Sequence, residues 1–163
     1  MDPVTTQLIN AARTGNTQTL KTLLNGEIDI DGQDEKGYTP LIIACYNNRA
    51  EAARLLIDNG ANVNCYDFGG NTPLMGVSFK GYPDIAELLI ENGADLDMQH
   101  GNGGTALMFA AMFGRNDLLE ILLRHGADTS LLDARGLSVF DLAAQQGNAE
   151  GLRILQHAIQ NNI

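Results

Sequence analysis

The side chains most able to support catalysis or hold a metal are few and scattered. There are three histidines, His100, His125 and His157, and two cysteines, Cys45 and Cys65. A zinc site needs closely spaced Cys and His ligands, and a nucleophilic site needs a convergent Ser, His and Asp; the sequence has neither pattern. We therefore expect no catalytic residue, no metal and no cofactor, and we interpret each histidine as structural or exposed.

One glycine-rich segment, residues 101–105, has the composition of a loop that holds a phosphate at the start of a helix. Segments 34–39, 67–72 and 133–138 occupy the same place in a repeating pattern. Because the segment recurs in this way, we interpret it as a structural turn and not as an anion site.

The repeating pattern has a period of 33 residues and organises the whole chain. A Thr-Pro-Leu motif, a preceding glycine, a Leu-Leu pair and a Gly-Ala pair all return at this spacing. The copies of the first motif are Thr39-Pro40-Leu41, Thr72-Pro73-Leu74, Thr105-Ala106-Leu107 and Ser138-Val139-Phe140. Counting back one period from Leu56 gives Leu23, so a weaker first copy precedes these four.

Each part of the period predicts a local structure. Thr or Ser caps a first helix, and Pro after it has a backbone angle already suited to that helix. Asn48, Gly81, Gly114 and Gly147 then turn the chain back, since they tolerate left-handed geometry. A second helix carries an apolar stripe and ends at a glycine. The remaining residues suit a projecting hairpin, so we expect ten helices in five antiparallel pairs with no extended sheet.

With this framework the chain resembles an ankyrin repeat protein over about residues 6–158. The resemblance implies an all-α solenoid of helix-turn-helix units with projecting β-hairpin loops. It also implies a single domain, 1–163, with repeats at about 1–33, 34–66, 67–99, 100–132 and 133–163. Polar Thr19 and Gln156 replace apolar residues of the central copies, so we expect the first and last repeats to be caps and the array to be complete.

The sequence departs from the family pattern at two places. The histidine that usually follows Thr-Pro-Leu is replaced by Ile42, Met75, Met108 and Asp141, so we expect apolar packing there in the three central copies. Repeat three has Gly76-Val77-Ser78 where an alanine pair is usual, which predicts a locally irregular helix.

The charge balance restricts the partner. The net charge is −10, with 20 acidic and 10 basic side chains, whereas nucleic acids and anionic membranes attract basic surfaces. No run of apolar residues is long enough to span a membrane, and the first residues lack the features of a signal sequence. We expect a cytoplasmic monomer whose partner is a protein, not nucleic acid or a membrane.

In the family, partners usually dock on the concave side, which hairpin tips and the ends of the first helices form. We carry that property over to the matching positions here. The expected partner-binding residues are Lys36, Tyr38, Tyr46, Tyr66, Phe68, Asn71, Phe79, Lys80, Asn102, Met112, Phe113 and Arg135. Six of the chain's nine aromatic residues are in this set, and aromatic clusters are typical of binding hot spots. Tyr46, Phe79 and Met112, one period apart, are expected to form an apolar ridge.

The resemblance favours a protein-binding module that acts by occlusion, as an inhibitor, immunity or adaptor protein. Single-domain proteins of this kind are common in bacteria, which favours protection from a toxin or regulation of an enzyme. A small-ligand-binding or catalytic protein that uses the concave groove is the alternative, and a structural subunit of a larger assembly is a third.

Overall fold

The computed structural model describes residues 1–161, which form ten α-helices and no β-strand. The last expected repeat, 133–163, therefore includes two residues outside the described part. The helices are α1 (Pro3–Thr14), α2 (Thr17–Leu24), α3 (Pro40–Tyr46), α4 (Ala50–Asp58), α5 (Pro73–Lys80), α6 (Pro83–Glu91), α7 (Ala106–Met112), α8 (Asn116–Arg124), α9 (Val139–Gln145) and α10 (Ala149–Asn161). The expected all-α solenoid of five helix pairs is confirmed.

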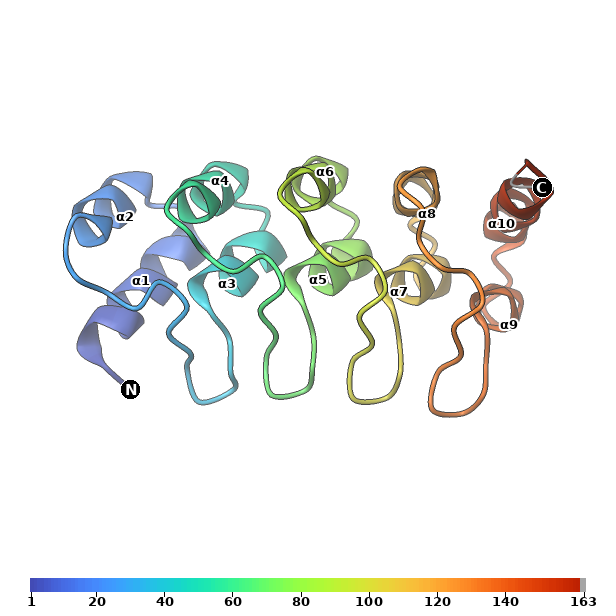
Figure 1. Cartoon of the computed structure of the whole chain (residues 1–163), viewed down its shortest axis with the longest axis horizontal. Helices are drawn as coiled ribbons and strands as arrows, with labels where there is room; N and C mark the ends of the chain where they lie inside the picture. The colour runs from blue at the N-terminus through green and yellow to red at the C-terminus, as the bar shows by residue number, and fades with distance from the viewer. Residues whose placement is uncertain (162–163) are drawn as a thin grey trace.

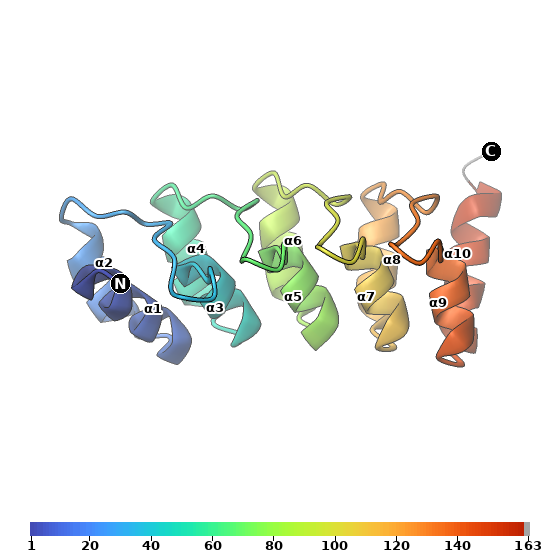
Figure 2. The same cartoon turned by 90° about the horizontal axis from the view of Figure 1, so that it is seen from below.

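The helices form two parallel rows (Figure 1). The odd-numbered helices stand side by side as an inner row, and the even-numbered helices form an outer row above them in this view. Each helix contacts its partner and the equivalent helix of the next pair. Four hairpin loops project from the inner row to one side, and the view from below shows them following one another along the array (Figures 1 and 2).

The helix starts follow from the sequence. The hydroxyl of Thr39 accepts a hydrogen bond from the Ile42 amide at 3.2 Å, and Thr72, Thr105 and Ser138 make the equivalent bond at 3.2 Å each. Between the paired helices, Asn48 is the one non-glycine residue among 1–161 with a positive φ, at 58°. It replaces the glycine found at this turn in later repeats, and Asn tolerates that conformation better than most residues.

The core is continuous along the array, because each repeat buries its apolar side against the next. Leu56, Leu89 and Leu122, one period apart in the outer helices, are all 0% exposed. Small residues such as Ala44 and Ala110 are fully buried in the inner helices, where they let neighbouring helices approach closely.

The structure accommodates both departures from the family pattern. Ile42, Met75 and Met108 are buried, as expected, whereas Asp141 accepts a hydrogen bond from the Ser138 amide at 2.9 Å. The expected irregularity at residues 76–78 is wrong: α5 runs unbroken through them. Helix α5 instead contains a buried hydroxyl, Ser78 Oγ, that has no hydrogen-bond partner.

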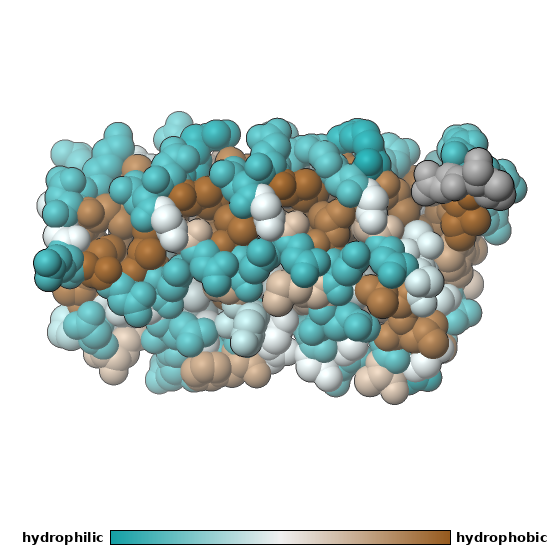
Figure 3. All heavy atoms as spheres, viewed as in Figure 1, coloured by the Kyte–Doolittle hydropathy of each residue, from teal (hydrophilic) through white to brown (hydrophobic). Residues whose placement is uncertain are grey.

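The surface matches this arrangement. Thr19 and Gln156, the polar replacements in the terminal repeats, are exposed. In the space-filling view, hydrophilic surface covers the outer helices and much of the hairpin side, and an apolar band runs between them along the array (Figure 3). No helix within residues 1–161 has the length and apolarity needed to cross a membrane.

Candidate partner-binding groove

Three aromatic side chains meet at the ends of neighbouring inner helices. The rings of Tyr46 and Phe79 are stacked, with centroids 6.3 Å apart and planes at 5°, and Phe113 meets Phe79 edge to face at 4.6 Å and 77°. The ammonium of Lys80 lies 4.9 Å from the centre of the Tyr46 ring, within cation–π distance. We call Tyr46, Phe79 and Phe113 the aromatic cluster. Tyr46 is 43% and Phe113 is 45% exposed, so the cluster faces solvent.

The stacking of repeats positions this cluster. Tyr46 is the last residue of α3, Phe79 lies in the last turn of α5, and Phe113 follows α7 directly. Because equivalent helices lie side by side, their ends form one line. We expected Met112 to continue the ridge after Tyr46 and Phe79, but the residue whose side chain meets Phe79 is Phe113. Met112 is half-buried and packs against the core.

Two hollows lie beside the inner helices, and Phe109 lines both; we call the surface that holds these hollows and the aromatic cluster the groove. The first has a volume of about 340 Å³ and includes Tyr38, Tyr46, Asn71 and Phe79 in its lining. The second, of about 440 Å³, includes Asn102, Met112 and Arg135. The structure therefore divides these expected partner-binding residues between two adjacent depressions.

Tyr66 and Phe68 lie apart from the aromatic cluster, on the hairpin of repeat three. They are 56% and 72% exposed, and both line a separate hollow of about 530 Å³ between this hairpin and the next. A backbone hydrogen bond links this hairpin to that of repeat two, because the Phe68 amide donates to the carbonyl of Lys36 at 3.1 Å. Of the seven large apolar side chains exposed in residues 1–161, four belong to the expected set: Tyr46, Tyr66, Phe68 and Phe113.

The hairpins that carry these residues are held by a recurring carboxylate. Oδ1 of Asp34 accepts hydrogen bonds from the amides of Lys36 and Tyr38, and Asp67 and Asp133 make the equivalent pairs of bonds. The amide of Leu137 holds the pKa of Asp133 below its ordinary value, and Arg135 adds to this effect. A charged acceptor that binds two amides makes strong hydrogen bonds, which stabilise the turn in these three loops.

Repeat four has a histidine in place of this aspartate. Nδ1 of His100 accepts from the Gly104 amide at 2.8 Å, and the ring packs edge to face on Phe109 at 5.1 Å. The interpretation of His100 as structural is thus supported. The ring of His125 lies 3.1 Å from Glu87, and His157 lies 2.8 Å from Asn161, so both contact surface groups.

The three basic side chains of the expected site differ in whether they form an ion pair within the protein. Arg135 forms an ion pair with Asp133 at 3.1 Å, so its charge is partly compensated within its own hairpin. Among residues 1–161, no carboxylate lies within 4.0 Å of the ammonium of Lys36 or Lys80. Lys80 is therefore an unpaired cation beside the aromatic cluster of an acidic chain, and Lys36 is a second one on the hairpin of repeat two.

The two cysteines lie inside the protein and not in the groove. Burial raises the pKa of the Cys65 thiol to about 11, although a 3.2 Å contact with the Thr39 hydroxyl acts in the opposite direction. Burial also raises the pKa of Cys45. The part of the chain that the structure describes contains no group of three or more His, Cys, Asp or Glu side chains able to hold a metal.

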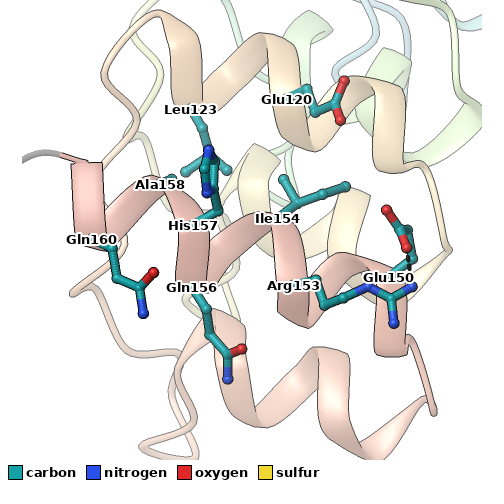
Figure 4. A pocket seen from close by; sticks show the side chains of 9 residues that line it. All are labelled: Glu120, Leu123, Glu150, Arg153, Ile154, Gln156, His157, Ala158 and Gln160. Carbon is teal, nitrogen blue, oxygen red and sulfur yellow. Dashed lines mark hydrogen bonds and ion pairs between the residues drawn. The ribbon is translucent and has the colours of Figure 1, made fainter.

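A further hollow, of about 660 Å³, lies elsewhere, between α8 and α10 (Figure 4). Its lining is mixed: Leu123, Ile154 and Ala158 lie beside His157, while Glu150 and Arg153 form an ion pair at its edge. Gln156 and Gln160 point away from these apolar side chains. This region has charged and amide groups where the groove has aromatic rings, so we place the candidate site in the groove.

Two positions of the repeat shape the site in ways that the sequence motifs did not indicate. One is shared by Gln33, Tyr66 and Gln99, and the other is that of Gly76. Gln33 and Gln99 each link two neighbouring hairpins, since the Gln33 amide donates to the carbonyls of Gly37 and Tyr66, at 2.9 and 3.0 Å. Tyr66 occupies the equivalent place in repeat three and exposes a ring there. Gly76 lines the first hollow at a place where other repeats carry a large side chain. Aligning the repeats reveals both exceptions.

A family model described as ankyrin repeats, in three copies, matches residues 8–100 and 74–163. No curated protein matches the chain.

Proposed function

Because the chain belongs to the ankyrin repeat family, whose repeats are generally protein–protein interaction modules, we propose that its groove binds a partner protein and occludes the surface it covers. The observation that carries this proposal is the aromatic cluster, which holds stacked rings at the protein surface. Two of these rings, Tyr46 and Phe113, stay 43% and 45% exposed in residues 1–161, although burying an aromatic side chain is strongly favourable.

The same groove suits the centre of a protein interface. Aromatic anchors in the middle and charged groups at the edge are the usual arrangement of binding hot spots. Here Tyr46, Phe79 and Phe113 form the centre, Lys36 and Lys80 lie at the edge, and Tyr66 and Phe68 extend the surface onto the hairpins. The twelve expected residues are the proposed contact set.

A protein that binds in this way acts on its partner by covering it. We propose an inhibitor, immunity or adaptor role in the cytoplasm, with the chain acting as a monomer and repeats one and five capping the single domain. The family is typically non-enzymatic, and no observation in the groove favours a catalytic role over binding.

The test compares two variants that each remove one apolar side chain. Phe79→Ala removes the ring in contact with both other members of the cluster, whereas Ile159→Ala removes a 43% exposed side chain of α10, far from the groove. Tagged wild-type protein and both variants would be used to isolate and identify the native partner, and each would then be titrated with the purified partner.

Phe79→Ala should weaken binding by about 2 kcal/mol or more, as truncating a central anchor does. Ile159→Ala should bind like the wild type, and a melting curve for each should show both variants folded. If the Ile159 variant loses affinity and the Phe79 variant does not, the partner binds away from the groove.

A further inference from the structure

Gly76 is the exception at its place in the repeat. The equivalent residues in repeats two, four and five are Ile43, Phe109 and Leu142, all large and apolar and at least half-buried. Gly76 lies inside α5, where a glycine lowers helix stability by about 0.5–1 kcal/mol relative to alanine. The structure should therefore show a reason for it.

Neither the backbone nor the packing requires a glycine there. Gly76 does not have a positive φ. A Cβ added to it would meet only Cδ2 of Tyr46, at 3.5 Å, which is an ordinary van der Waals contact. A side chain would fit at this position, so the effect of the glycine is to leave space unfilled.

That space is the first hollow of the groove, of about 340 Å³. Tyr38, Ile43, Tyr46, Phe79 and Phe109 contribute to its walls, and Gly76 leaves its inner surface open. For comparison, a cavity of about 150 Å³ holds benzene. The hollow is thus large enough for the side chain of a leucine or a phenylalanine, together with part of the backbone that carries it.

The charges near the hollow indicate which charge a bound partner should carry next to it. The Lys80 ammonium lies over the Tyr46 ring, and no carboxylate of the described residues pairs with it. Asp67 also lines the hollow, but its Oδ1 already accepts from the amides of Gly69 and Asn71. A carboxylate on the partner would therefore meet an unpaired cation.

We propose that the hollow at Gly76 receives one large apolar side chain of the partner protein, and that an acidic residue next to that side chain in the partner pairs with Lys80. This inference rests on the proposed function, since it specifies the chemistry of the partner that the same groove binds. Gly76 then acts as a specificity-determining residue: its missing side chain is replaced by one from the partner.

The test uses a defined probe. A phage-displayed library of random peptides is selected against the wild-type protein, and the most enriched sequence is synthesised with a fluorescent label. The enriched peptides should share a Leu, Phe, Met or Trp next to an Asp or Glu. Peptides with basic residues at that place, or no enrichment at all, would overturn the proposal.

Gly76→Leu places in the hollow the side chain that repeat five carries at Leu142. It should lower affinity for the labelled peptide by about tenfold or more, as loss of a central anchor pocket does. Melting should be unchanged or higher, because leucine is a better helix former than glycine. Gly76→Ala is the matched control: it gains helix stability, fills little of the hollow and should keep most of the affinity.

Two further variants separate this inference from the proposed function. Lys80→Glu should slow association of the acidic peptide, whereas unchanged association and affinity would remove Lys80 from the proposal. If Phe79→Ala weakens binding but Gly76→Leu does not, the groove binds the peptide and the hollow does not receive its side chain. If neither variant weakens binding, both proposals are wrong.

Discussion

Ser78 has a buried hydroxyl that makes no hydrogen bond. In the unfolded chain water satisfies this group, so burying it alone opposes folding. Ala111 is fully buried at the same place one repeat later, which shows that a methyl group fits there. Ser78→Ala should therefore raise the free energy of unfolding by about 1 kcal/mol.

Urea denaturation would measure this change, with Ser138→Ala as the control. Ser138 caps α9 through its hydroxyl, so the same substitution there should lower stability by about 1 kcal/mol. If Ser78→Ala destabilises the protein as much as Ser138→Ala does, the hydroxyl has a partner in solution.

The buried thiols make stability depend on pH. The unfolded thiol ionises near pH 9.0, whereas Cys65 in the folded protein ionises near pH 11, and the pKa of Cys45 is also raised. Above pH 9.0 the unfolded state loses thiol protons that the folded state keeps, so the equilibrium shifts toward unfolding. The stability contribution is complete below that pH and should be lost as the pH rises toward 11.

Denaturation between pH 8 and 11 would measure this loss. The double variant Cys45→Ala/Cys65→Ala should show a shallower decline over the same range, because it has no thiol to ionise. Equal slopes for the two proteins would show that the thiols are not the cause.

Among the elements, the hairpins differ at one repeat position, where Tyr66 exposes a ring and the equivalent glutamines form hydrogen bonds between hairpins. Gln33 and Gln99 each join two hairpins by two hydrogen bonds, and Tyr66 makes no such bridge at the equivalent place. Tyr66→Gln should restore the bridge, to the carbonyls of Gly70 and Gln99, and stabilise the protein by about 0.5–1.5 kcal/mol.

The same substitution removes an exposed ring from the proposed contact set, so it should weaken partner binding while raising the melting temperature. Tyr66→Ala separates the two effects, because it removes the ring without adding a bridge. Both variants should lose affinity, and only Tyr66→Gln should gain stability. A Tyr66→Gln variant with full affinity would place Tyr66 outside the interface.

Across the whole molecule, stability depends on contacts between neighbouring repeats. Leu56, Leu89 and Leu122 are equally buried, yet Leu89 lies in the central repeat, where a defect leaves two repeats on each side, fewer than a stable array needs. Each Leu→Ala variant should lose about 2–5 kcal/mol of stability, with Leu89→Ala losing the most. Denaturant midpoints of the three variants would test this order, and an unchanged midpoint for Leu89→Ala would contradict it.

The sequence by itself determined the architecture, because the architecture is local and repeated. The 33-residue period, the Thr and Ser caps, the turn at Asn48 and the buried leucines were all predicted and all confirmed. Each depends on residues close together in the chain or on a stripe that recurs at constant spacing, so aligning the copies is enough to find it.

The tertiary structure decided which side chains meet, because that depends on rotation and on neighbours. Phe113 follows the last residue of α7 and its ring meets Phe79, whereas the adjacent Met112, still in the helix, packs against the core. The pairing of Arg135 with Asp133 and the hollow at Gly76 likewise depend on side-chain positions that the repeat pattern does not specify. Periodicity identified the candidate residues, and packing between repeats decided which of them lie together.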